Sequence, residues 1–153
     1  MANVSNPRKK FNYSIQIAPA PINPFLSQTA DLPDVDIEQT SHGDTNHDVK
    51  TGGRVTVGNL SLDKIMTTGG ADNYMYDWAM SVQDMVLGGG LVPSDYKRIV
   101  TVSELAEDGT SILNTWVCTG CWPTKVNGLS LDRMSSDNTI ESVELSVDRM
   151  DKL

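Results

Sequence analysis

The segment Cys118-Thr119-Gly120-Cys121 is the most obvious candidate for chemistry, because paired cysteines at this spacing serve redox reactions and zinc sites. A redox pair normally opens a helix, whose N-terminus lowers the pKa of a thiol, whereas this pair ends an expected strand and precedes Trp122-Pro123. A structural zinc site needs two more ligands, and the spacing of His42 and His47 fits poorly. We therefore expect two reduced thiols with no metal or cofactor; a zinc analysis would test the metal alternative.

A second candidate is a polar stretch in which His42 and His47 stand beside Asp44 and Asp48. Imidazoles and carboxylates could bind a metal or carry acid–base catalysis, but the simpler interpretation is a solvated loop that contacts a partner. The chain has no Gly-x-Ser-x-Gly, phosphate-binding loop or dinucleotide fingerprint. We predict that the protein is not an enzyme, with a Cys/His metalloenzyme as the alternative.

Acidic side chains line one face of each of two expected strands. The first strand carries Asp34, Asp36 and Glu38, and the second carries Glu144 and Asp148, each with an apolar face behind it. Such faces are ordinarily the solvated outside of a packed sheet, but they could also border something negatively charged that must not adhere. The net charge of −8 argues against a protein that grips nucleic acid by its phosphates.

The elements that position these residues are mostly strands. Alternation of apolar and polar residues predicts strands over residues 11–17, 34–39, 54–62, 96–105, 112–119 and 140–149. We expect a mainly β fold, with two packed antiparallel sheets forming a β-barrel-like sandwich. The polar connection 40–53 is long for a compact domain, and such loops are usually functional or ordered by a partner.

One segment has helical spacing, over about residues 73–87. Its apolar residues Met75, Trp78, Val82 and Met85 recur three and four positions apart, and Gly88-Gly89-Gly90 ends the pattern. We expect this apolar stripe to pack against the sheets.

The length of 153 residues indicates one domain, which we place at 11–150 after an N-terminal arm at 1–10. Three bases of that arm, Arg8, Lys9 and Lys10, are adjacent in the sequence. No apolar run reaches the length of a membrane span, and no apolar core of a signal peptide follows these bases. The sequence predicts a chain made in the cytoplasm, without a membrane partner.

Several segments in this order resemble one known family. They are the N-terminal strand, a Pro-rich loop, the acidic strand, the long polar loop, Leu60-Ser61-Leu62-Asp63-Lys64, Tyr76-Asp77-Trp78, the 96–104 strand, Asp108-Gly109, Trp116, Gly120-Cys121-Trp122-Pro123, Gly128-Leu129-Ser130-Leu131-Asp132 and Ile140-Glu141-Ser142-Val143-Glu144-Leu145. Over residues 8–150 the chain resembles the tail tube proteins of contractile-tailed phages, a fold family that includes the inner tubes of type VI secretion and extracellular contractile injection systems. Cys121 departs from the small residue expected there.

The resemblance implies a structural virion protein without an active site. Six subunits would form a ring whose strands join into a ring-wide β-barrel, and rings would stack into a tail tube that passes DNA and the tape-measure protein. The other implied partners are the tail sheath, the baseplate hub and the tail terminator. The acidic residues Asp34, Asp36, Glu38, Glu144 and Asp148 then become candidates for the lumen wall.

The arm 1–10 and the loop 40–53 become candidates for contacts between rings or neighbouring subunits, and the helix stripe could pack on an adjacent subunit instead of its own core. The contact candidates are Arg8, Lys9, Lys10, His42, Asp44, His47, Asp48 and Lys50. The alternatives are an injection-system tube that carries a protein effector and a monomeric β-sandwich binding module.

Overall fold

The strand β7 (Ile112–Val126) joins the two sheets of the computed structural model, which describes residues 8, 10–18, 27–43, 46–66 and 74–153. Its first half lies between β6 (Arg98–Leu105) and β9 (Arg149–Lys152), and its second half pairs with β8 (Ile140–Ser146). The chain turns from one sheet to the other at Gly120, whose φ is +69°. A side chain at Gly120 would collide with the Asp148 carboxylate, so glycine is needed here for both conformation and space.

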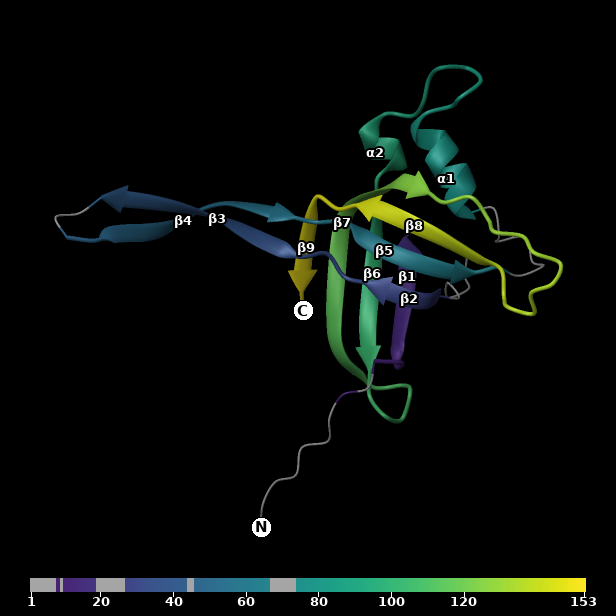
Figure 1. Cartoon of the computed structure of the whole chain (residues 1–153), viewed down its shortest axis with the longest axis horizontal. Coiled ribbons are helices and arrows are strands. Elements are labelled where there is room, and N and C mark those ends of the chain that lie inside the picture. Colours follow the sequence, from purple (N-terminus) through teal and green to yellow (C-terminus); the bar gives the residue numbers. More distant parts are fainter. Residues whose placement is uncertain (1–7, 9, 19–26, 44–45, 67–73) are drawn as a thin grey trace, which may run out of the picture.

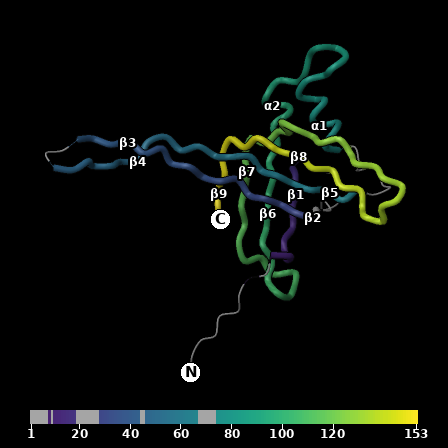
Figure 2. The backbone as a smooth tube through the Cα atoms, in the orientation of Figure 1, coloured from purple at the N-terminus to yellow at the C-terminus, as the bar shows by residue number. Residues whose placement is uncertain are grey.

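Both sheets are antiparallel, which confirms the expected fold class (Figure 1). The first sheet has the order β1–β6–β7–β9, where β1 spans Tyr13–Ala18. The second has the order β2–β5–β8–β7, where β2 spans Ser27–Asp31 and β5 spans Leu60–Ile65. The strands of the two sheets cross one another in the tube view, and the described strands do not close into a barrel within one chain (Figure 2).

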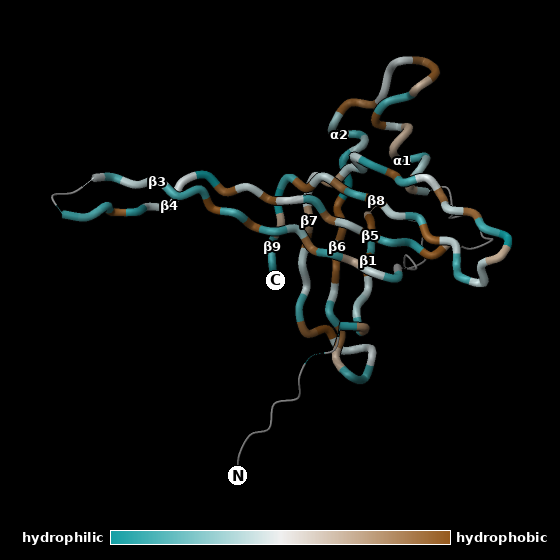
Figure 3. Tube along the Cα trace, viewed as in Figure 1, coloured by the Kyte–Doolittle hydropathy of each residue, from teal (hydrophilic) through white to brown (hydrophobic). Residues whose placement is uncertain are grey.

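The core lies between these sheets and is built from the inward-facing half of each alternating pattern. The buried side chains come from both sheets and α1, and include Ile15, Ile17, Leu60, Leu62, Met75, Trp78, Val100, Val143 and Leu145. Figure 3 shows the matching alternation of hydrophobic and hydrophilic residues along the strands.

The helix α1 (Tyr74–Val82) packs against β7 and is shorter than the expected helix 73–87. Met75 and Trp78 are buried, and the Trp78 Nε1 donates a hydrogen bond of 2.7 Å to the carbonyl of Tyr96. Val82 is half-buried at the last helical position. The expectation that Met85 packs on the sheets is wrong, because the helix ends before it and its side chain is 73% exposed.

The greatest difference from the sequence prediction concerns residues 40–53. This segment is not a loop: most of it belongs to a long hairpin of β3 (Val35–Gly43) and β4 (Asp48–Val57), which projects far from the two sheets (Figure 1). Val49 is the one large apolar residue among the described residues of its distal half, where neither face is covered, so no hydrophobic alternation marked this half as a strand.

Two smaller features complete the fold. The expected fault near Gly58-Asn59 separates β4 from β5, and the short helix α2 (Pro93–Tyr96) precedes β6. Among the described residues, no helix has the length and apolar character needed to cross a bilayer.

Candidate assembly surfaces

The β3–β4 hairpin is exposed along almost its whole length. Every residue of β3 is exposed, including Val35 at 51% and Ile37 at 62%, and on β4 Val55 is 55% exposed. Ile37 pairs with Val55 and Val35 with Val57, so these apolar side chains share one face. Because water covers that face in the single chain, the hairpin gains little stability from it until another molecule covers it.

The two strands of the hairpin differ in their charges. Asp36 and Glu38 lie on β3, just after Asp34, whereas β4 carries the bases Lys50 and Arg54 together with the acid Asp48. The expected apolar face behind these acidic residues is formed by Val35 and Ile37, but both faces of β3 are exposed, so this face is not packed within the chain.

Most of the predicted contact residues of the polar stretch lie at the far end of this hairpin. His42 pairs with Val49, and Lys50 with Ser41, while Asp48 begins β4 and His47 lies in the connecting bend. All are exposed, and the described residues contain no group of three His, Cys, Asp or Glu side chains that could hold a metal. Asp44 lies outside the described residues.

A second surface is the polar outer face of the second sheet, which sequence reasoning found only at Glu144. The side chains alternate with buried Leu62 and Val143, so they point away from the core; they are Thr29, Asp31, Ser61, Asp63, Lys125, Ser142 and Glu144. The Asp63 carboxylate accepts hydrogen bonds of 2.8 Å from the Thr29 hydroxyl and 2.7 Å from the Ser142 hydroxyl. The alternation Leu60-Ser61-Leu62-Asp63 could have placed the Asp63 carboxylate on this outer face from the sequence alone.

Asp148, the last of the predicted acidic residues, lies at the corner near Gly120 and is not part of that face. Its Oδ2 is 2.6 Å from the Lys97 Nζ, and this hydrogen bond raises the pKa of Lys97 above its ordinary value. The pair is exposed, so solvent screens it and its charge is largely balanced locally.

The cysteine pair lies at the same corner, fully buried, with both thiols free. The Cys121 Sγ is 3.3 Å from the Cys118 carbonyl, and hydrogen bonding with the Cys118 thiol, together with burial, raises the pKa of Cys121. Both side chains belong to the hydrophobic core, which gives them a packing role.

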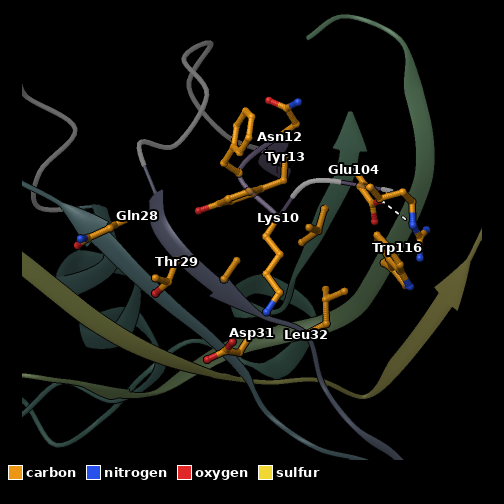
Figure 4. A pocket seen from close by; sticks show the side chains of 13 residues that line it. Lys10, Asn12, Tyr13, Gln28, Thr29, Asp31, Leu32, Glu104 and Trp116 are labelled. Carbon is orange, nitrogen blue, oxygen red and sulfur yellow. Dashed lines mark ion pairs between the residues drawn. The ribbon is translucent and has the colours of Figure 1, made fainter. Parts of the chain in front are cut away.

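A third surface is a pocket of about 690 Å³ at the open mouth between the two sheets (Figure 4). Tyr13, Leu32, Val102 and Trp116 supply its apolar and aromatic lining. Around them, Arg8 forms an ion pair with Glu104 at 3.3 Å, and Lys10 extends toward Asp31 (Figure 4). Two of the predicted contact residues, Arg8 and Lys10, therefore line this pocket, whereas Lys9 and the rest of the arm before Arg8 lie outside the described residues.

Solved structures with this fold come from contractile machines. The anti-feeding prophage tube-terminating cap is 21% identical, with a TM-score of 0.82, over 100% of this chain and 95% of that chain. The sheath/tube terminator of an extracellular contractile injection system is 21% identical, with a TM-score of 0.81, over 99% of each chain. Hcp1 from Flavobacterium johnsoniae is 15% identical, with a TM-score of 0.57, over 93% of this chain and 94% of that chain.

The chain thus shares its fold with tube-cap and sheath/tube-terminator proteins of contractile systems. The family described as T4-like virus tail tube protein gp19 matches residues 9–151, and the chain belongs to this family. No curated protein sequence matches it significantly. It is a structural tail-tube protein of a contractile particle.

Proposed function

We propose that six copies of this protein form a ring and that rings stack into the inner tube of a contractile particle. The observation that carries the proposal is the β3–β4 hairpin, which exposes Val35, Ile37 and Val55 on one face while the family builds tubes. Open strand edges support it as well, because β2 and β1 each have a neighbour on one side only among the strands that the structure describes. A ring satisfies such edges through a head-to-tail interface that closes.

In this assembly the polar face of the second sheet lines the lumen. Asp31, Asp63 and Glu144 outnumber the base Lys125 that pairs with Glu144 on that face, and Ser61 and Ser142 add hydroxyls, so DNA phosphates or an acidic cargo meet a net acidic surface. Asp34, Asp36 and Glu38 extend the acidic character along β3. Replacing Asp63 and Glu144 by Lys should leave tubes intact but slow ejection; unchanged ejection would reject this lumen assignment.

The cargo is DNA, guided by the tape-measure protein, if the particle is a phage tail, which is the sense of the family description. An injection-system tube carrying a protein effector is the second candidate, favoured by the likeness to anti-feeding prophage and extracellular injection-system structures. In both cases the tube is located within the particle and assembles with a sheath, a baseplate hub and a terminator.

Negative-stain electron microscopy of the purified protein tests the proposal. We expect rings or tubes with a central hole. Featureless monomers at high protein concentration would contradict it and favour the β-sandwich binding module instead.

A further inference from the structure

The connection from β7 to β8 begins with Asn127-Gly128, which is the one Asn-Gly pair in the sequence. Asn127 lies directly after β7, and its backbone N–H still donates a hydrogen bond of 2.9 Å to the Ser142 carbonyl. Every residue from 127 to 138 is exposed. The pair therefore lies where the ordered edge of the second sheet passes into a segment that is open to water.

The groups that react in deamidation, the side-chain amide of the Asn and the backbone nitrogen of the following residue, are unhindered at this pair. Within the described part of the chain, no hydrogen bond holds the Asn127 side-chain amide, and the Gly128 N–H has no acceptor. A Cβ placed on Gly128 would have nothing within 4 Å. The Gly128 nitrogen can therefore approach the Asn127 Cγ without breaking a native hydrogen bond or displacing a neighbour.

The Asp108-Gly109 pair in the β6–β7 turn could close the same five-membered ring, but hydrogen bonds hold it. Backbone N–H groups of Thr110 and Ser111 donate to the Asp108 carboxylate at 3.0 and 2.9 Å. The Gly109 N–H donates to the Ala106 carbonyl at 2.9 Å. Ring closure would break these bonds, and an ionised carboxylate is also a poor target for a nucleophile. The two exposed turns therefore differ in how well the fold protects them.

We infer that Asn127 is a site of spontaneous deamidation in the folded protein. Hydroxide removes the proton of the Gly128 N–H, and the nitrogen attacks the Asn127 Cγ to close a cyclic imide. The bond from Cγ to Nδ2 breaks, and the departing group takes a proton from water and leaves as ammonia. Water then opens the imide at either carbonyl, which leaves an aspartyl residue or an isoaspartyl residue whose backbone runs through the side-chain carbon.

This reaction changes the outer face of the second sheet. Val126 packs against the core and pairs with Val143, so strand alternation places the Asn127 side chain on the opposite face, beside Ser142. Ser142 pairs in turn with Asp63, so each modified copy gains a carboxylate in the same cross-strand row. The isoaspartyl form also adds a CH2 group to the backbone where the connection leaves the sheet. The inference goes beyond the proposed tube function and does not depend on it.

The test is incubation of the full chain in water enriched in the heavy oxygen isotope, followed by peptide mass mapping. A methyltransferase specific for isoaspartyl residues labels the second product. We expect labelled product at Asn127 that accumulates faster as the pH rises. Its rate in the folded chain should lie within about tenfold of the rate in guanidinium-unfolded chain, because the fold then adds less than about 1.4 kcal/mol to the barrier. At Asp108, folding should suppress the isoaspartyl product by more than about tenfold.

The variant Gly128→Ala keeps Asn127 but puts a methyl group beside the attacking nitrogen. It should slow the reaction by about tenfold or more, and it should unfold at the wild-type temperature because the added Cβ has nothing within 4 Å. Gly89→Ala is the matched control, since a Cβ there also meets nothing within 4 Å, and its rate at Asn127 should be unchanged.

Two results would overturn the inference. One is an unfolded chain that reacts at Asn127 while the folded chain does not, because the fold would then protect the pair. The other is an equal rate in Gly128→Ala and in the wild-type protein, because the Gly128 nitrogen would then not be the attacking group. Neither result bears on the proposed tube, which microscopy of the unmodified protein tests separately.

Discussion

The β3–β4 hairpin and the β5–β8 pair of the second sheet are built from similar sequence patterns but have opposite surroundings. On β5, Leu60 and Leu62 are 0% and 1% exposed, whereas on β3, Val35 and Ile37 are 51% and 62% exposed. Both pairs alternate with polar residues and hydrogen-bond to an antiparallel neighbour. Alternation therefore identifies an apolar face but does not tell which molecule covers it.

Deleting residues 41–52 should have the largest effect on assembly. The deletion removes most of the paired hairpin but no residue of the core, so the free chain should keep its fold while tubes disappear. Sedimentation and negative-stain microscopy give assembly, and thermal unfolding gives stability. Normal tubes would show that the distal part of the hairpin has no part in assembly, and loss of folding would show that the hairpin and core are not independent.

Trp78→Ala should have the largest effect on stability. This side chain is 1% exposed, contacts the rest of the core and holds the guanidinium of Arg98 4.9 Å from its ring. We expect a loss of about 3–5 kcal/mol in the free energy of unfolding, measured by urea denaturation. A loss below about 1 kcal/mol, the range of surface sites, would mean that α1 is not part of the core unit.

A matched pair of smaller truncations compares the two regions directly. Leu62→Ala should cost about 2–5 kcal/mol because it leaves a cavity, whereas Ile37→Ala should change the monomer by no more than about 0.5 kcal/mol. In assembled protein the difference between the two losses should be smaller, since Ile37 becomes covered there. Equal losses in the monomer would contradict the difference in burial, and an Ile37→Ala variant that assembles normally would remove Ile37 from the interface.

A substitution in the β6–β7 turn should have the smallest effect on stability, and this hairpin serves as a control for the β3–β4 hairpin. Backbone N–H groups of Ser111 and Thr110 donate to the Asp108 carboxylate and lower its pKa from 3.8 to about 2. Since the folded-state pKa is lowered, its contribution is complete above the ordinary pKa and disappears as the pH falls through about 2. At neutral pH the wild-type protein should unfold at a slightly higher temperature than Asp108→Asn, as followed by circular dichroism. Near pH 1.5 the two proteins should unfold at the same temperature. A difference that persists at the lower pH would contradict this role.

Sequence reasoning predicted the mainly β class, the two-sheet packing and the burial of Met75 and Trp78, because these depend on local apolar spacing within one chain. It missed the distal hairpin, because no other part of the chain covers that segment and its residues therefore do not alternate between apolar and polar. It also predicted too long a helix, because the apolar spacing continues to Met85 although the helix ends at Val82. Among the site residues, Glu144 was found from its strand, but Asp63 and the pocket were not. The pocket is formed by segments distant in the sequence, such as Tyr13, Leu32 and Trp116, and no local pattern indicates that they meet.

The pairing of β1 with β6 has a consequence for the order of folding. Tyr13 pairs with Glu104 and Ala18 with Ile99, whereas β3 with β4 and β6 with β7 pair across short connections. Closing a long segment of chain delays contact formation, so β1 should join its sheet after the local hairpins have formed. Because Tyr13 and the residues before it line the pocket, that pocket is completed only in the last stage. A chain whose synthesis or folding is unfinished therefore lacks this surface even when its local hairpins are already in place.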